Sequence, residues 1–154
     1  MKNYRTIFII ICFLLAAPVV LYAQTATEIE RLLETEAVSY GQAAWLVLEA
    51  ADLSGSFENS ASDGAFNFAA QQGWLPKKAA PQDKASLEGV SLLVMRSFGI
   101  KGGLFYSLLK NPHYAYREMV YKDIIQGRSD PQMPVSGGLL LFLVNRVLSR
   151  AEEQ

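Results

Sequence analysis

The sequence is poor in the residues that build disulfides, metal sites and catalytic centres. It has one cysteine, Cys12, and one histidine, His113, among 154 residues. A disulfide needs two cysteines, and a structural zinc site usually needs four ligands drawn from Cys, His and carboxylates. His113 has no second histidine, cysteine or tight carboxylate cluster near it, which is typical of a packing residue. We therefore expect no catalytic residue, no metal site and no cofactor, and the chain is not predicted to be an enzyme.

The chain also lacks an excess of basic residues. It has 14 lysines and arginines against 15 aspartates and glutamates, a net charge of −1. Without Lys2 and Arg5, which belong to the N-terminal segment, the count is 12 against 15 and the net charge is −3. Binding to nucleic acid phosphates requires a positively charged surface. The balance argues against nucleic acid as a partner, and it does not favour an anionic membrane surface either.

One long hydrophobic run is present, over residues 7–22. The two basic residues precede it, Pro18 interrupts it, and Ala23 offers a small residue at a cleavage position, which together are typical of a secretory signal. A membrane-spanning helix needs about 20 apolar residues, and this run is shorter. We predict that residues 1–23 are a cleaved signal peptide, with a retained membrane anchor as the alternative. The protein would then be exported, and periplasmic or envelope-associated.

The remaining sequence is patterned for helices separated by turns. Ser39 is followed three residues later by Gln42, which fits a capping box at the start of an apolar helix. Asn111 followed by Pro112 fits an N-cap with proline at the first helical position. The predicted helices cover residues 27–36, 40–52, 62–72, 86–98, 112–123 and 136–149. The predicted fold class is all-α, a small helical bundle, with the last helix at its centre because it contains the run Leu139–Val144.

The stretch between Gly102 and Lys110 is too apolar for an ordinary exposed loop. Two interpretations stay open for it. It is either a short helix packed on the core or a loop that covers a groove.

The sequence also matches itself at an offset of fifty residues. The matching pairs include Pro81 and Pro131, Ser86 and Ser136, and Arg96 and Arg146. Ser39 joins this series at an offset of 47 from Ser86. The resulting order is A-B-A-B-A, where A is a Ser-capped apolar helix and B is a shorter helix that ends in a turn. Repeats of this kind cannot each bury a core alone, so they stack.

The stretch from His113 through Ile124-Ile125-Gln126-Gly127 and Pro131 to the Ser136 cap resembles the S-layer homology repeat. The resemblance covers residues 38–149 and is strongest over 113–149. It implies stacked helical repeats in an exported bacterial envelope protein. The domain organisation it implies is a signal peptide at 1–23, an N-terminal helix and linker at 24–37, an S-layer-homology-like repeat domain at 38–150 and a tail at 151–154.

One departure from that family affects the expected function. S-layer homology domains hold anionic cell-wall polymers, and an arginine directly after the cap residue is central to this binding. Here the three positions are occupied by Tyr40, Leu87 and Gly137. Without the arginine, the bidentate contact to an anion is lost. We expect an exported, non-catalytic structural or protein-interaction module of the cell envelope. A module that binds peptidoglycan or another envelope polymer is the alternative.

Five residues are candidates for contact with a ligand or partner. In the polymer-binding alternative, Tyr114, Tyr116 and Arg128 act together with helix N-termini in place of the arginines. Arg96 and Arg146 either lie with their stems along apolar surface or form a shared site for an anion or an acidic partner. The expected partner is an envelope protein or a cell-wall polymer. A membrane is expected as a partner only through the N-terminal segment, if that segment is uncleaved.

The first prediction concerns this N-terminal segment. Cleavage after Ala23 should give a mature protein that begins near Gln24, because the small residue follows the apolar run at the usual distance. Intact mass or N-terminal sequencing of the exported protein would measure it. A protein that keeps Met1, or that has a lipid mass on Cys12, would contradict the prediction.

Overall fold

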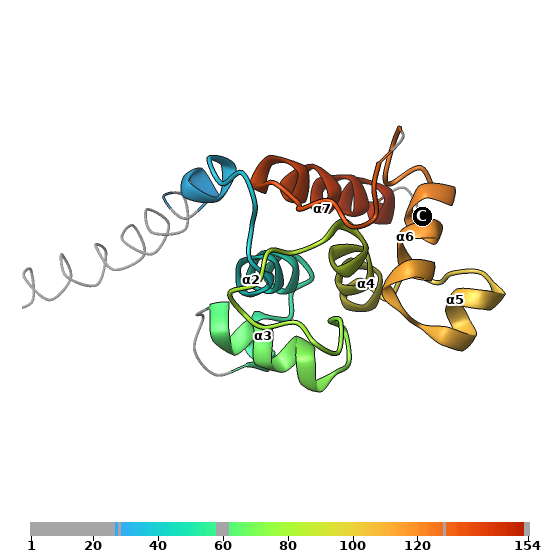
Figure 1. The fold of residues 1–154 in the computed structure, drawn as a ribbon, viewed down its shortest axis with the longest axis horizontal. Coiled ribbons are helices and arrows are strands. Elements are labelled where there is room, and N and C mark those ends of the chain that lie inside the picture. The colour runs from blue at the N-terminus through green and yellow to red at the C-terminus, as the bar shows by residue number, and fades with distance from the viewer. Residues whose placement is uncertain (1–26, 28, 58–61, 128, 153–154) are drawn as a thin grey trace, which may run out of the picture. The chain divides into compact units, whose positions relative to one another are not determined.

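The fold is shown as a computed structural model in Figure 1. The structure describes residues 27, 29–57, 62–127 and 129–152. The chain divides into two compact units, residues 1–34 and 35–154. In the first unit the predicted signal lies outside the described residues, and residues 29–33 are helical. The helix predicted over 27–36 therefore ends earlier, and residue 34 is already in a turn.

The described part of the second unit consists of helices and turns. Its elements are, in order, α2 (Tyr40–Ala50), the 3-10 turn η1 (Ser54–Ser56), α3 (Ser62–Gln71), α4 (Leu87–Ser97), α5 (Leu104–Leu109), α6 (Pro112–Tyr121) and α7 (Gly137–Glu152). No strand occurs among the described residues, and the prediction of an all-α fold is confirmed. Within the same residues, no helix has both the length and the apolar character needed to cross a membrane.

The predicted helices of this unit all appear, and their ends differ by one to three residues. The largest difference is in α7, which was predicted to end at residue 149 and continues to Glu152. Its last turn therefore extends into the stretch predicted as a tail. Alanine and glutamate favour helix, and nothing between 149 and 152 breaks one.

Three segments of the chain meet in a ring of backbone hydrogen bonds. The N–H of Val38 donates to the carbonyl of Val135 (2.8 Å), that of Val135 to Ala85 (2.9 Å), and that of Ala85 to Val38 (2.8 Å). All three side chains are fully buried. Each of these residues directly precedes the serine that caps α2, α4 or α7. The ring therefore fixes the starting points of the three capped helices against one another.

The same three helices satisfy their first-turn N–H groups in matching ways. Their cap oxygens accept hydrogen bonds of 3.2 Å, Ser39 from Gln42, Ser86 from Gly89 and Ser136 from Leu139. The first helical N–H of each donates to a loop carbonyl of another segment, Tyr40 to Asp83, Leu87 to Met133 and Gly137 to Thr35. Few donors of the first turns are thus left without a partner, which is the usual weakness of a helix start.

Helices α3 and α6, of ten residues each, end in the same kind of turn. Gly73 and Asp123 follow them with φ of 68° and 53°, in the left-handed region. In each turn the next N–H reaches back into the helix, from Trp74 to the Ala69 carbonyl and from Ile124 to the Met119 carbonyl, both at 2.9 Å. Glycine adopts this conformation freely and aspartate tolerates it, so both residues can end a helix in this way.

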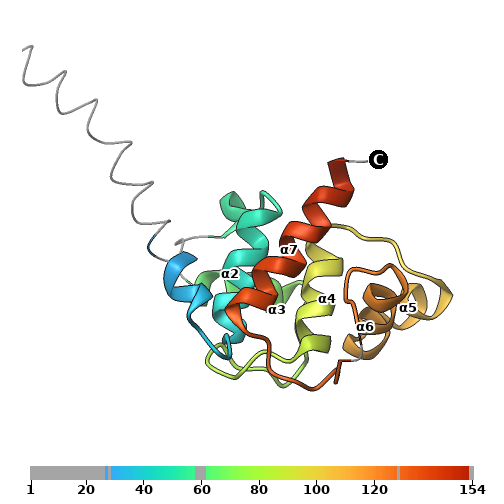
Figure 2. The same cartoon turned by 90° about the horizontal axis from the view of Figure 1, so that it is seen from above.

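The central helix of the unit is α4, and the prediction that α7 is central was wrong. Figure 2 shows α4 between α2 and the pair α5–α6. Eight of the eleven residues of α4 are buried, including Ser91. In α7 only one stripe of side chains is buried. Phe142, within the apolar run, is 47% exposed, and Leu148, one turn beyond the run, is 38% exposed. Helix α7 packs on one side only, so its apolar run is wider than the face that is covered.

Helix α5 settles the alternatives for the stretch 102–110. The stretch is a short helix, but it packs on the rest of the unit through a single buried side chain, Tyr106, which is 4% exposed. Its four other apolar side chains are exposed. Figures 1 and 2 both show α5 at the edge of the unit, beyond α6.

The second prediction compares two positions of α7. Ser136→Ala removes one cap bond and should lower the free energy of unfolding by about 1 kcal/mol. Leu143→Ala should lower it by roughly 2–5 kcal/mol, because this side chain is fully buried and its truncation opens a cavity. Urea unfolding of both variants would measure the two losses. A smaller loss for Leu143→Ala than for Ser136→Ala would show that α7 does not contribute to the core.

Candidate functional site

Two of the predicted contact residues lie on α6 and are partly engaged within the protein. The hydroxyl of Tyr116 donates to the carbonyl of Ser129 at 2.6 Å, so this side chain ties α6 to the following loop. The ring of Tyr114 is stacked on that of Phe105 with the centroids 5.7 Å apart, and His113 meets Tyr114 edge-on. Tyr114 is thus one of three adjacent aromatic rings, of which Phe105 and His113 are exposed. Arg128 lies outside the described residues.

The two arginines that match in sequence have different surroundings. The guanidinium of Arg146 lies 5.7 Å from the centroid of the Phe142 ring on the same helix. Its Nε is buried without a hydrogen-bond partner among the described residues. Arg96, near the end of α4, instead lines an open cleft. The structure therefore places Arg146 along an apolar surface and gives Arg96 an environment suited to binding.

The positions at which the S-layer homology pattern has arginines are closed. Tyr40 and Leu87 are 6% and 1% exposed, and Gly137 is buried. The Tyr40 hydroxyl shares a 3.0 Å hydrogen bond with Ser86 Oγ and accepts a second bond from the Ser86 N–H at 3.3 Å. Its ring also covers Gly89, where a Cβ would lie 2.8 Å from Tyr40 Cε1. Tyr40 thus occupies the space over the first turn of α4.

A groove beside this closed position is apolar. Its volume is about 360 Å³, and its walls include Leu87, Met133 and Phe142. Asp130 is its only charged lining residue among those described. The described residues that line this groove offer no cation to an acidic ligand.

The opposite end of α4 carries a basic cleft. It has a volume of about 410 Å³ and lies between the end of α4, the loop that follows it and α5. Its lining residues are Met95, Arg96, Gly99, Ile100, Lys101, Gly102, Tyr106, Ser107 and Lys110. Three of these nine are basic and none is acidic. We call this the basic cleft.

Tyr106 is the buried aromatic residue among those that line the basic cleft. The side chain is 96% buried by area, and its hydroxyl has no hydrogen-bond partner among the described residues. Burial raises the pKa of the Tyr106 phenol, while the charge of Arg96 acts to lower it and that of Glu118 to raise it. Gly102 makes room for the ring, because a Cβ at this position would lie 2.5 Å from Tyr106 Cδ1. A buried donor without a partner is unusual in a folded protein and suggests a site for a ligand atom.

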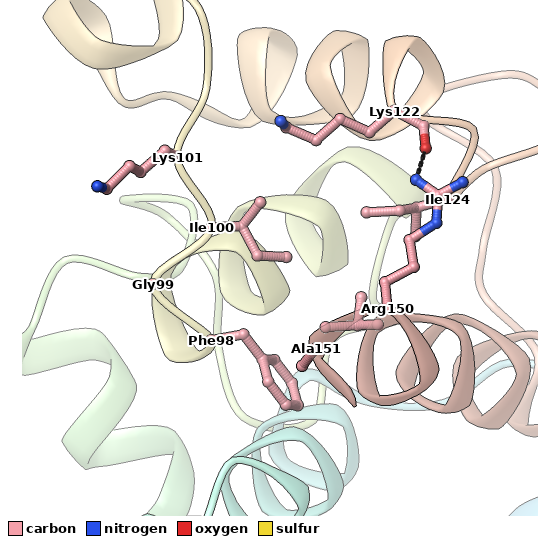
Figure 3. Close-up of a pocket in the computed structure, with 9 residues that line it drawn as sticks. Phe98, Gly99, Ile100, Lys101, Lys122, Ile124, Arg150 and Ala151 are labelled. Carbon is pink, nitrogen blue, oxygen red and sulfur yellow. Dashed lines mark hydrogen bonds between the residues drawn. The ribbon is translucent and has the colours of Figure 1, made fainter. Parts of the chain in front are cut away.

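A second cleft adjoins the first and shares Lys101 with it. Figure 3 shows this cleft, of about 410 Å³, with Lys101, Lys122 and Arg150 around an apolar interior that includes Phe98 and Ile100. The guanidinium of Arg150 donates to the carbonyl of Lys122, which ties the end of α7 to the end of α6. Among the described residues that line this cleft there is again no acid. Positive charge is therefore concentrated around the loop between α4 and α5.

Sequence reasoning identified Arg96, and grouped Tyr106 with the other tyrosines as either surface or packing residues, but it missed the two lysines of the basic cleft. The glycine pair Gly102-Gly103 was the available signal, because close packing of Tyr106 requires a residue without a side chain at position 102. No group of three or more His, Cys, Asp or Glu side chains that could hold a metal ion occurs in the described part of the chain.

Comparison of this chain with protein-family models, with curated proteins and with solved structures gave no match.

The third prediction contrasts two buried tyrosines. Tyr106→Phe removes a hydroxyl that has no partner, so it should leave the free energy of unfolding unchanged or raise it by up to about 1–3 kcal/mol. Tyr40→Phe breaks the bonds to Ser86 and should lower it by about 1 kcal/mol. Urea unfolding of the ligand-free protein at neutral pH would measure both.

A pH series adds a signed check. The pKa of the Tyr106 phenol is higher in the folded protein than its unfolded value of about 10. The contribution of this phenol to the free energy of unfolding is therefore lost as pH rises above that value. In the Tyr106→Phe variant this loss should be absent. Equal destabilisation by Tyr106→Phe and Tyr40→Phe would show that the Tyr106 hydroxyl has a partner in solution.

Proposed function

We propose that this chain is an exported, non-catalytic interaction module of the cell envelope, built from degenerate S-layer-homology-like repeats. The observation that carries the proposal is the ring of hydrogen bonds between Val38, Ala85 and Val135. Three copies of one structural unit, joined at the same residue of each, would form such a ring. The signal-like sequence at residues 1–23 supplies the reason to place the module outside the cytoplasm.

The matching ends of the helices support the same repeat interpretation. α3 and α6 end in the same turn, at Gly73 and Asp123, which are fifty residues apart. α2 and α4 end alike at Asp52 and Gly99, with φ of 57° and 61°, and these are 47 residues apart. The serine caps show the same two offsets, 50 residues from Ser86 to Ser136 and 47 from Ser39 to Ser86. Matching turns at matching spacing are expected when one supersecondary unit recurs along a chain.

The closed cap positions favour a structural or protein-interaction role over polymer binding. Tyr40 and Leu87 belong to the core, and the groove beside Leu87 has no basic lining residue among those described. An anionic polymer held in the manner of the S-layer homology family would lack its arginine contacts here. The residues of the basic cleft lie at the other end of α4, which argues for a different kind of partner.

One observation favours the alternative of a module that binds peptidoglycan or another envelope polymer. Phe105, His113 and Tyr114 form a row of adjacent rings on α5 and α6, and aromatic rings with accessible faces are suited to stacking on sugars. Tyr114 would be the central residue of such a contact.

The fourth prediction separates these two functions. The purified protein should stay in the supernatant when it is mixed with protein-free and lipid-free sacculi and centrifuged, and it should fractionate with the envelope in cells. Sedimentation with the bare sacculi would overturn the first proposal. If it occurs and is weakened by Tyr114→Ala but not by Tyr121→Ala, the polymer-binding alternative is supported. Tyr121 is a matched control because it is 84% exposed on the same helix. A protein found only in the cytoplasm would contradict both.

A further inference from the structure

Helix α5 exposes an unusual amount of apolar surface for its length. Of its six residues, Leu104 is 80% exposed, Leu108 77%, Phe105 63% and Leu109 51%. Only Tyr106 points inward, and it anchors the helix to the rest of the unit. Single exposed leucines are common on protein surfaces, but four large apolar side chains on less than two turns form a contiguous patch. We call these four residues the α5 apolar patch.

Basic side chains surround this patch. Lys101 precedes α5 and Lys110 follows it, and both are exposed. Both also line the basic cleft together with Arg96. Tyr106 lines the same cleft, and its hydroxyl group, which is buried, has no hydrogen-bond partner among the described residues. The nearest acid is Glu118 of α6, which packs against Gly102 and Gly103 and does not line the cleft.

We propose that α5 docks on the surface of an anionic phospholipid bilayer. The α5 apolar patch lies among the outer parts of the acyl chains, and a lipid phosphate occupies the basic cleft between Arg96, Lys101 and Lys110. The inference differs from the expectation drawn from the net charge, because the chain is acidic as a whole while the described lining of this cleft is basic. It names the partner of the proposed envelope module, and it rests on that proposal only for the location of the protein.

The complementarity of the two surfaces carries this assignment. A bilayer interface offers hydrocarbon directly beneath a layer of phosphates, and here apolar side chains lie beside a cleft that three basic residues line. Lysines at both ends of the helix can extend to the headgroups while their neighbours enter the hydrocarbon. The stacked rings of Phe105 and Tyr114 suit the boundary between the two layers, where aromatic residues are enriched.

The shape of α5 favours a bilayer over a folded protein as the occupant. A stable protein interface buries about 800 Å² on each partner, far more than six residues at the edge of a unit provide. Figures 1 and 2 show α5 projecting at that edge. A fluid bilayer adapts to a small projecting element, whereas a protein partner would need a matching pocket.

The experiment measures the environment of α5 directly. In a Cys12→Ser background of the full chain, an environment-sensitive fluorophore is attached to Leu108→Cys, and as control to Gln71→Cys, an exposed position of α3. On vesicles of equal parts phosphatidylcholine and phosphatidylglycerol, the probe at 108 should shift to shorter wavelength and be quenched by brominated acyl chains. The probe at 71 should do neither. Because the probe reports on α5, a retained N-terminal segment does not change the interpretation.

Charge variants test the phosphate contact. Lys101→Gln combined with Lys110→Gln should weaken binding to the anionic vesicles by roughly thirtyfold, since each basic residue near the surface contributes about a fivefold factor. The matched pair Lys77→Gln and Lys78→Gln, exposed on a distant loop, should change it little. Arg96→Gln should lower the preference for anionic over pure phosphatidylcholine vesicles.

Several results would overturn the proposal. The first is an unshifted probe at 108 on both kinds of vesicle, and the second is an equal shift at 71. A third is a shift that grows with protein concentration in the absence of vesicles, which would assign the patch to a second copy of the chain. The vesicle measurement uses purified protein and does not depend on export, so its failure and the failure of the proposed function are distinguishable.

Discussion

The ring of hydrogen bonds between Val38, Ala85 and Val135 is the constraint on which the rest of the second unit depends. Each residue donates to one neighbour and accepts from the other, so displacing any one segment breaks two bonds. The ring is fully buried, and a backbone group left without a partner there would cost about 1–3 kcal/mol. Three chain segments that are far apart in sequence are thereby held at one point, and the directions of α2, α4 and α7 follow from it.

The same constraint decides where a partner can bind. Because the three helix starts converge at the ring, their first turns are covered by neighbouring segments, and Tyr40 lies across the start of α4. The far end of α4 has no such cover. There the chain leaves the helix at Gly99 and makes a loop to α5, and Arg96 and Lys101 border open space. The three basic residues that line the basic cleft therefore lie at the end of the unit that the ring does not organise.

The parts of the fold that depend on local chemistry could be predicted from the sequence. Serine at 39 and 136 and Asn111 before Pro112 satisfy helix N–H groups in their own turn, so the sequence locates these helix starts closely. The burial of a helix, by contrast, depends on elements that lie far away in the sequence. The apolar run of α7 indicated a central helix, but how many faces are covered depends on neighbours, and Phe142 is left half exposed. The central position of α4 could not be read from its own residues.

The candidate site was harder to predict for the same reason. Arg96 stood out because it matches Arg146 at an offset of fifty residues, yet the structure gives the two arginines different surroundings. Lys101 and Lys110 are ordinary in sequence and become a pair only because α5 is short and both of its ends return to the same cleft. The contribution of Tyr106 depends on a missing hydrogen bond, which no sequence pattern encodes.

Helix α5 has two features that are each unfavourable in a folded protein, and both occur within its six residues. One is a buried hydroxyl group without a hydrogen-bond partner among the described residues, and the other is a group of exposed apolar side chains. The Tyr106 hydroxyl is one of two buried side-chain polar atoms without a hydrogen-bond partner among the described residues, and the other is Arg146 Nε. Elsewhere large apolar side chains are mostly covered, whereas four on α5 are exposed. A folded chain tolerates such local inconsistencies chiefly where function requires them. Exposed apolar side chains beside a group of basic residues are unfavourable in water alone. An anionic bilayer surface offers hydrocarbon to the first and phosphates to the second.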